Sequence, residues 1–242
     1  MIKKSLRASI EILGISLLTI IFMGVPNAFG FSLFDGTFNN SAWSSTKLVD
    51  TTSGASATST STQKISGGNP GAYRETTHIW TISVPGVSIV FGHIYTPVSY
   101  NPSTQGALAS LSYSSDAMVQ TAPWVNAIGF GPLLEQSGNY FWAAGSSVVV
   151  NTGWNSLSGT YTNSDFSQVG GSANPDFSES GAQIKFGYFT ANGGSGSVRP
   201  LTAIGGVDNL SVNAEVIPEP SSMLLLGAGL LGAGLIRRKK KS

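Results

Sequence analysis

The sequence predicts an all-β protein, an antiparallel jelly-roll-like β-sandwich flanked by an N-terminal signal helix and a short C-terminal apolar helix. Stretches of alternating apolar and polar residues recur through the 242-residue chain, separated by clusters of Gly, Pro, Asn and Ser. No helical window of useful length lies between Phe31 and Glu215. Many short strands with turn signals are typical of two packed antiparallel sheets, and a segment of this length suits one such domain.

The first 30 residues have the order of a secretory signal peptide. A basic stretch from Met1 to Arg7 precedes an apolar run from Ile12 to Val25, and small residues follow. The run is short for a membrane span, so we expect residues 1–30 to be a signal peptide that is cleaved after Gly30. Cleavage after Ala28, or a permanent N-terminal anchor, are the alternatives.

Residues 31–215 form the predicted sandwich domain. Thr77–Val84 alternates an apolar face with a Thr and Ser face, Pro85-Gly86 marks a turn, and Val87–Tyr95 is expected to be the partner strand. Thr51–Thr62 has no apolar period, so we expect a flexible insertion or a long loop there. Further strands are expected at residues 107–113, 124–130, 140–144, 147–151, 154–161, 182–190 and 207–214.

Charge is distributed unevenly along the chain. The net charge is +1, with 10% charged against 41% hydrophobic residues, but residues 1–30 carry +2 and residues 218–242 carry +4. Residues 31–217, with five basic and ten acidic side chains, therefore carry −5. Such a weakly charged, mildly acidic domain suits the outside of a cell. It lacks the basic patch with which proteins bind nucleic acid. Because the chain has no cysteine, a disulfide framework, a thiolate zinc site, an iron–sulfur cluster and a Cys nucleophile are excluded.

The C-terminal segment has three parts. Pro218, Glu219 and Pro220 precede an apolar run from Met223 to Ile236. As a helix this run would be roughly 21 Å long, shorter than the ~30 Å hydrocarbon core of a bilayer. The basic tail that follows stays cytoplasmic by the positive-inside rule, which predicts a transient stop-transfer device. That tail consists of Arg237, Arg238, Lys239, Lys240 and Lys241.

These three parts, in this order, closely resemble the PEP-CTERM sorting signal over Val216–Ser242. The resemblance implies a protein exported across the inner membrane of a Gram-negative bacterium, with signal peptidase and an exosortase as processing partners. The exosortase is expected to recognise Pro218, Glu219 and Pro220. The C-terminal helix would anchor the protein transiently in the inner membrane before release or attachment at the cell surface, in bacteria that make exopolysaccharide.

The domain between the two ends shows a second resemblance. Phe34–Phe38, Gly68–Arg74, Asp176-Phe177 with Gly181–Tyr188, and Gly206–Val212 follow one another as in the β-sandwich domains of many PEP-CTERM proteins. Those domains are similar to laminin-G-like and carbohydrate-binding jelly rolls. The resemblance implies a fold more than a ligand.

The sequence contains no evident catalytic cluster, so we expect no enzymatic activity. A glycosidase needs two carboxylates roughly 5–10 Å apart, but the nearest acids, Asp176 and Glu179, lie in a Pro- and Ser-rich stretch where turn roles are expected. Gly194–Ser197 lies in a Gly-rich loop far from both histidines, so it does not form a nucleophile elbow.

Few side chains are candidates for metal binding. His78 and His93 fall on the apolar faces of their strands, which favours hydrogen-bonded structural roles over a zinc pair that has no third ligand. Calcium is a more natural ion for a jelly roll. Asp35 near the first strand and Asp208 at the last would meet if the terminal strands pair; the alternative is that Asp208-Asn209 forms a turn.

Aromatic residues are the remaining candidates for ligand binding. Trp and Tyr fill sandwich cores, but their rings also stack on the C–H faces of sugars. Trp43 and Trp124 stand beside polar or Pro-marked loops, so they are the candidate glycan-stacking residues on the surface.

Together these features predict a non-catalytic, exported and surface-sorted β-sandwich protein of the envelope or exopolysaccharide matrix, with polysaccharide as the candidate ligand. One alternative is a structural or adhesive matrix protein with protein partners, which an exposed apolar patch would favour. The other is a glycan-cleaving enzyme, which requires two carboxylates facing each other across a groove.

Overall fold

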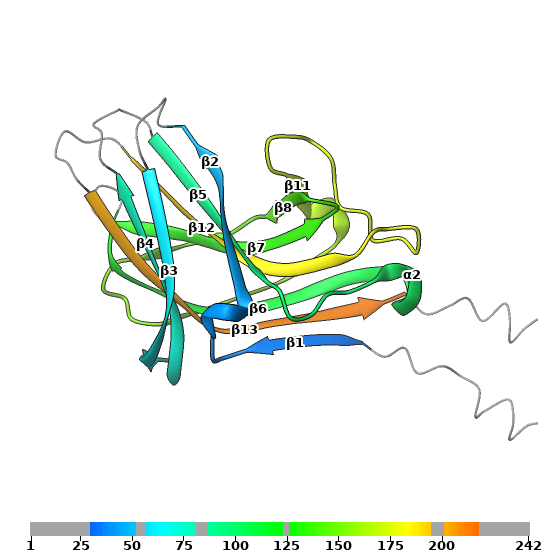
Figure 1. The fold of residues 1–242 in the computed structure, drawn as a ribbon, viewed down its shortest axis with the longest axis horizontal. Coiled ribbons are helices and arrows are strands. Elements are labelled where there is room, and N and C mark those ends of the chain that lie inside the picture. The colour runs from blue at the N-terminus through cyan, green and yellow to red at the C-terminus, as the bar shows by residue number, and fades with distance from the viewer. Residues whose placement is uncertain (1–29, 52–56, 81–86, 123–125, 195–200, 218–242) are drawn as a thin grey trace, which may run out of the picture. The chain divides into compact units, whose positions relative to one another are not determined.

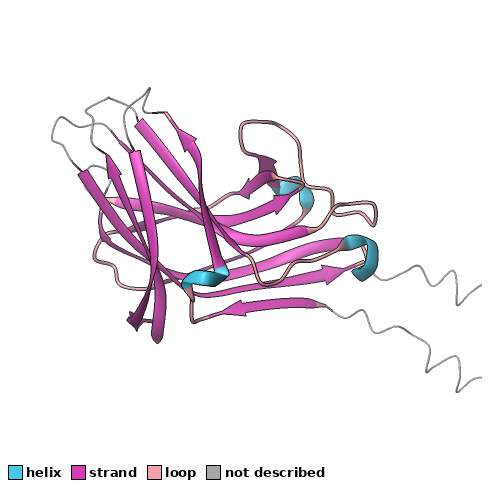
Figure 2. Ribbon diagram, in the orientation of Figure 1, coloured by secondary structure: helices cyan, strands magenta, loops and turns pink. Residues whose placement is uncertain are grey.

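The computed structural model describes residues 30–51, 57–80, 87–122, 126–194 and 201–217. The predicted signal peptide, Trp124 and the predicted sorting tail lie outside these residues. Strands make up most of the described chain (Figures 1 and 2). The strands are β1 (Phe31–Asp35), β2 (Trp43–Asp50), β3 (Ala57–Gly68), β4 (Gly71–Trp80), β5 (Val87–Tyr95), β6 (Leu108–Thr121), β7 (Ala127–Gln136), β8 (Asn139–Ala143), β9 (Ser146–Val149), β10 (Asn155–Tyr161), β11 (Phe166–Gln168), β12 (Ile184–Gly194) and β13 (Leu201–Val216). The helical elements are η1 (Asn40–Ala42), α2 (Pro102–Gln105) and η2 (Asn163–Asp165).

The strands form two sheets, and every pairing between described strands is antiparallel. Sheet A has the order β10-β6-β13-β4-β3, and β1 also pairs with β13. Sheet B has the order β11-β8-β7-β12-β5-β2, and β9 also pairs with β7. The two sheets pack face to face as a sandwich, so the predicted fold class is confirmed.

The main core lies between the sheets because the strands alternate buried and exposed side chains. In β6, Leu111, Tyr113 and Ala117 are buried, whereas Ser112 and Ser114 are exposed on the opposite face. Such a period of two is what a sheet with one buried face requires. The largest fully buried side chains of the core are Trp80, Tyr100, Tyr188, Phe38, Phe130, Phe166 and Phe186.

The expected pairing of the strand after Thr77 with Val87–Tyr95 is wrong. β4 belongs to sheet A and pairs with β3 and β13, whereas β5 belongs to sheet B and pairs with β12 and β2. Both strands direct large side chains into the same core, where the rings of His78 and Phe91 lie 5.4 Å apart. The two strands therefore face each other across the sandwich.

The loop expected at Thr51–Thr62 is wrong for residues 57–62, which begin the edge strand β3; residues 52–56 lie outside the described chain. Hydroxyl-bearing side chains occupy both faces of this strand, so the sequence has no apolar period to reveal it. The inner face meets a polar part of the interior, where Ser61 Oγ lies 3.0 Å from Thr76 Oγ1. Thr is β-branched and suits a strand even without an apolar face.

Sheet B buries apolar side chains on both faces. Four buried residues lie outside the main core cluster on the outer face of sheet B, which is the face turned away from sheet A. Their registers place them in three adjacent rows across the central strands. These residues are Val90, Ile94, Leu133 and Phe189.

Glycines alternate with large side chains on this outer face. One row runs Gly92, Phe189 and Gly131 across β5, β12 and β7, and the next row places Gly187 between Ile94 and Leu133. A Cβ atom on Gly131 would lie 2.5 Å from Phe189 Cε1, and one on Gly92 would lie 2.6 Å from Leu133 Cδ2. The glycines therefore provide the space into which neighbouring side chains fold.

The outer face of sheet B is also concave. The hydroxyl groups of Tyr140 on β8 and Thr46 on β2 lie 3.4 Å apart, although three strands separate β8 from β2. In a flat sheet four strand spacings cover roughly 19 Å, which is farther than these two side chains span. The sheet therefore curls until its two sides meet above the apolar rows.

Replacing Gly131 with Ala should destabilise the protein by about 1–3 kcal/mol, because the added methyl group overpacks against Phe189 and against Gly145 Cα, 2.8 Å away. Gly129 on the same strand and face is the matched control, since its added Cβ would meet nothing closer than Ala191 Cβ at 3.5 Å. Gly129→Ala should leave stability unchanged or slightly increased. Urea unfolding of both variants measures the difference; equal effects would contradict the packing described.

Candidate functional site

An aromatic cluster lies on the outer face of sheet B. Trp142 and Tyr140 point outward from β8, while Phe141 between them is buried in the core. The rings of Trp142 and Phe189 lie 5.8 Å apart, and both Trp142 and Tyr140 are half-buried. A partly exposed indole backed by a second ring is a suitable surface for stacking a flat apolar ligand face.

Polar groups lie directly beside these rings. In the next row of the face, Lys185 Nζ lies 2.7 Å from Glu135 Oε2, and Tyr140 is the strand neighbour of Glu135. Thr46 completes the other side of the concave face through its contact with Tyr140. Among the described residues of β5, β7, β8 and β12, Glu135 is the one carboxylate on this face.

Trp43, the expected surface residue for glycan stacking, instead lies in the core. It is only 7% exposed, its Nε1 donates a hydrogen bond of 2.8 Å to Asp35 Oδ2, and its ring stacks on Phe38 at 5.4 Å. The guanidinium of Arg74 covers the ring at 5.8 Å. The polar residues beside Trp43 in sequence misled the prediction, whereas the alternation of outward Tyr140 and Trp142 with inward Phe141 was the signal that was missed.

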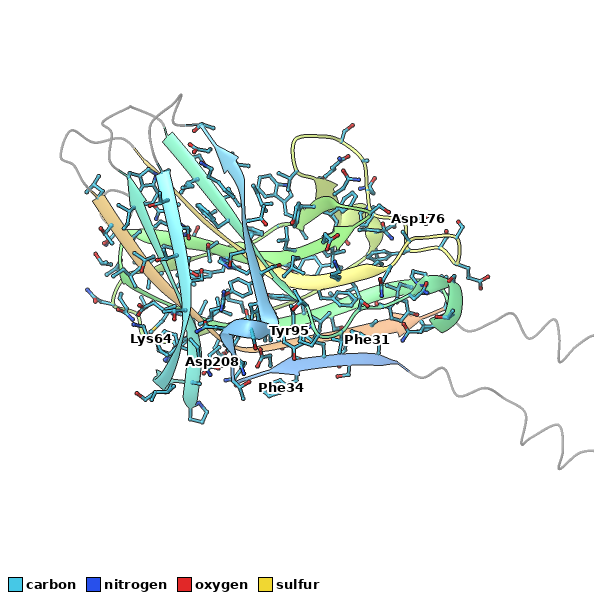
Figure 3. The ribbon with its side chains drawn as sticks, viewed as in Figure 1. Phe31, Phe34, Lys64, Tyr95, Asp176 and Asp208 are labelled. Carbon is cyan, nitrogen blue, oxygen red and sulfur yellow. The ribbon has the colours of Figure 1, made fainter. Side chains whose placement is uncertain are left out.

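The structure brings Asp35 and Asp208 onto neighbouring strands, because β1 pairs with β13. Asp35 accepts hydrogen bonds from the Thr37 and Phe38 amides and from Trp43, and Asp208 accepts them from the Asn69 and Asn209 amides. Asp208 is labelled in Figure 3. Both carboxylates therefore organise local backbone. Calcium binding at this pair stays a prediction.

One carboxylate pair escaped the sequence analysis. Asp116 on β6 is the register partner of Asp208 on β13, 92 positions away in sequence. Burial raises the pKa of Asp208, and the nearby carboxylates of Asp116 and Asp35 add to the shift. Because Asp208 is fully buried, this pair does not present two carboxylates to a substrate.

The turn role expected for Asp176 is confirmed. Its Oδ1 accepts a hydrogen bond of 2.9 Å from the Ser178 amide. Hydrogen bonds from Ser178 hold the pKa of Asp176 below its usual value. This carboxylate therefore stabilises a turn (Figure 3).

Both histidines lie in the interior, as their strand phases predict. His93 Nδ1 lies 2.9 Å from Ser45 Oγ, and its ring stacks on Tyr188 at 4.7 Å. His78 packs against Trp80 and Phe91, and its ring nitrogens have no hydrogen-bond partner among the described residues. The expected hydrogen bonding therefore holds for His93 and not for His78. Nowhere in the described ranges do three His, Asp or Glu side chains gather as a metal site would require.

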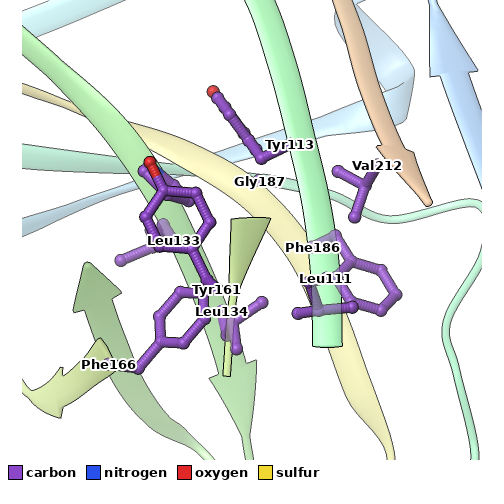
Figure 4. Close-up of a pocket in the computed structure, with 10 residues that line it drawn as sticks. Leu111, Tyr113, Leu133, Leu134, Tyr161, Phe166, Phe186, Gly187 and Val212 are labelled. Atoms are coloured by element: carbon purple, nitrogen blue, oxygen red, sulfur yellow. The ribbon is translucent and has the colours of Figure 1, made fainter. Parts of the chain in front are cut away.

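One small cavity lies between the two sheets. A cavity of about 10 Å³ lies beside Tyr161 and Phe166 (Figure 4), and its remaining walls are largely apolar, including Leu111, Phe186 and Val212. It has room for about one water molecule. This cavity is part of the core packing and has no room for a sugar.

Acidification should destabilise the protein through His78. Burial lowers the pKa of His78 to about 4 from 6.5, so the unfolded chain takes up a proton at a pH where the folded protein does not. The His78 contribution is complete above pH 6.5 and falls as the pH drops to about 4, by roughly 3 kcal/mol.

The measurement compares urea unfolding of the wild type and His78→Phe at pH 7.5 and 4.5. Phe retains a ring against Trp80 and Phe91 but does not titrate, so the variant should lose less stability between the two pH values. The pKa of His93 is also lowered, by burial and then by Arg74 and His78, and this residue remains in both proteins. Identical pH dependence in the two proteins would contradict the role of His78.

Two carbohydrate-binding domains of known structure are distantly similar to this chain. A solved family 11 carbohydrate-binding module from Clostridium thermocellum, in complex with a beta-1,3-1,4-mixed-linked tetrasaccharide, is 15% identical, with 76% of this chain and 94% of that chain covered and a TM-score of 0.43. A family 22 xylan-binding domain from Paenibacillus barcinonensis is 12% identical, with 71% and 96% covered and a TM-score of 0.35. Likenesses this distant establish neither the ligand nor the activity of the chain.

No curated protein matches the chain. Within the described residues there is no helix with the length and apolar character needed to cross a membrane. The model of the PEP-CTERM protein-sorting motif matches residues 216–240. The chain thus carries a PEP-CTERM sorting motif at its C-terminal end, as its three-part sequence predicted.

Proposed function

We propose that this chain is an exported, surface-sorted and non-catalytic protein whose sandwich binds polysaccharide on the outer face of sheet B. The observation that carries the proposal is the half-buried Trp142, which packs on Phe189 at the side of a concave face, with Glu135 and Lys185 in the next row. A sugar ring stacked on the indole would place its hydroxyl groups near these polar side chains.

The charge of the domain favours a neutral polysaccharide. Residues 31–217 carry −5, which repels an acidic polymer over the distance of a Debye length. Lys185, the basic group beside the rings, is already paired with Glu135. Recognition through ring stacking and hydrogen bonds therefore fits this face better than recognition through charge.

A binding role also fits better than the two alternatives. Hydrolysis requires two carboxylates across the bond, but the described strands place only Glu135 on this face. An adhesive surface calls for a contiguous apolar patch, whereas the exposed large hydrophobic side chains of the described chain come from five separate segments. These are Phe34, Ile65, Val98, Val149 and Ile217.

Trp142→Ala should weaken polysaccharide retention about tenfold or more, since a stacked aromatic ring contributes on the order of 1–2 kcal/mol. Affinity electrophoresis through neutral polymers, including β-1,3-1,4-glucan, xylan and the exopolysaccharide of the host, measures the loss. Trp154→Ala is the matched control: its ring is also half-buried but packs on Tyr73 of sheet A, with centroids 5.4 Å apart. Unfolding curves verify that both variants are folded. Equal retention of the two variants would refute a binding site at Trp142.

Sorting is tested by replacing Pro218, Glu219 and Pro220 with Ala in the native host. We expect the full-length precursor to accumulate at the inner membrane, because the exosortase no longer recognises it. Replacement of the adjacent Ser221 and Ser222 with Ala is the control and should leave processing intact. A mature mass and location unaffected by the first replacement would exclude exosortase as the processing enzyme.

A further inference from the structure

Strand β10 is an edge strand whose outer backbone groups have no partner strand in the described chain. Asn155–Tyr161 pairs with β6 on one side, from Asn155 opposite Ala117 to Tyr161 opposite Leu111. The other side of an edge strand presents a row of unpaired N–H and C=O groups, which is a template for another strand. Seven residues are enough to form a typical strand pair.

The other long edges of the two sheets carry features that block such pairing, and β10 does not. β3, at the opposite edge of sheet A, carries Lys64 and is covered near Gln63 by hydrogen bonds with Asn40 and Thr37. β2, at the edge of sheet B, carries the exposed Lys47 and a bulge directly after it. Lysines and bulges of this kind prevent edge-to-edge association.

By contrast, the sequence of β10 is Asn-Ser-Leu-Ser-Gly-Thr-Tyr, without a charge or a proline, and its pairing with β6 has no irregularity. The remaining edge strands are shorter: β11 has three residues, β9 has four and β1 has five. Within the described chain, β10 is thus the long edge left open.

The residues of β10 fit a second copy of the same strand. An antiparallel pair centred on Ser158 places Ser158 opposite Ser158 of the partner subunit and Ser156 opposite Thr160 of the partner subunit. These side chains lie on the exposed outer face of sheet A, where cross-strand hydroxyl pairs hydrogen-bond. No like charges meet at any position of this register.

The inner side of the same register joins apolar groups. Leu157 would face Gly159 of the partner subunit. Within each copy Tyr161 covers its own Gly159, since the Tyr161 hydroxyl lies 2.6 Å from the position of a Cβ added to Gly159. Leu157 and Tyr161 both pack against the main core. Pairing would therefore extend the core of each sandwich across the edge.

The surface next to β10 continues this polar pattern. A shallow depression of about 260 Å³ is lined by Ser112 and Ser114 of β6, Ser158 and Thr160 of β10, and Asn213 of β13. Ser112 Oγ and Thr160 Oγ1 lie 3.3 Å apart, so hydroxyl pairs of the kind expected between two copies already occur between β6 and β10.

From these features we infer that two copies of the chain associate through β10 as a symmetric dimer with one continuous sheet. A two-fold axis passes beside Ser158, and the interface is the same patch on both copies. The outer face of sheet B takes no part in this contact. If that face binds polysaccharide, the dimer holds two such faces and gains avidity on a polymer; the dimer itself does not depend on that function.

The absence of cysteine from the chain makes the inference directly testable in the exported full-length protein. Residues opposite each other in an antiparallel pair have Cα atoms about 4.5–5.5 Å apart, within the range of a disulfide. Ser158→Cys should therefore form a covalent dimer in the oxidising periplasm, visible on a non-reducing gel and lost on reduction. Ser112→Cys, equally exposed on the same face but on the internal strand β6, is the control and should remain a monomer.

The register has its own test. Ser156→Cys and Thr160→Cys, expressed separately, should give little dimer, because each new thiol would face a hydroxyl group. Expressed together with different tags, they should form the mixed dimer. Crosslinking of Ser158→Cys no greater than that of Ser112→Cys, together with no mixed dimer from the second pair, would overturn the inference.

Discussion

The structure of sheet B depends on the alternation of glycine with large side chains across its central strands. Gly131 and Gly92 leave space above the sheet, and Phe189 and Leu133 fold into that space. This packing gives sheet B a second apolar layer on the side opposite the main core. It also allows the sheet to curl until Tyr140 reaches Thr46. The same curl raises Trp142 at the side of a concave surface, so the candidate binding ring is positioned by residues that have no side chain of their own.

Three polar side chains are buried together with the apolar core between the sheets. Arg74, His78 and His93 are all buried there, and buried charge is costly unless it is paired. The two histidines avoid that cost by remaining neutral, as their lowered pKa values indicate. The Arg74 guanidinium lies over the ring of Trp43, which is itself held by Asp35. Asp35 therefore holds the Trp43 indole in place, and this indole in turn packs against Arg74 in the polar part of the core.

The sequence revealed whatever depends on local alternation and little of what depends on partners distant in the chain. The strand at Val87–Tyr95 was predictable because an apolar, β-branched run follows the Pro85-Gly86 turn signal, but its sheet was not, since β12 and β2 lie far away in sequence. β3 was missed because hydroxyl groups occupy both of its faces. The glycine rows of sheet B become visible only when the registers of β5, β12 and β7 are known. Trp43 was wrongly predicted to lie on the surface because its neighbours in sequence are polar. Its contacts with Asp35 and Arg74, which are not adjacent to it in sequence, hold its ring in the core.

The first and last described strands show where the folded domain ends and the sorting motif begins. The first and last described strands pair, with Phe31 opposite Ala214, so the chain enters and leaves the sandwich on neighbouring strands. Backbone hydrogen bonding continues to Ile217, whose amide binds Ala107 O at 2.8 Å, and Pro218 follows immediately. The matched motif begins at residue 216, the last residue of β13. Val216 pairs with Leu108, so the described strand pairings remain complete only where the chain is cut after Ile217. Such a cut would change the location of the domain without altering its strand pairings.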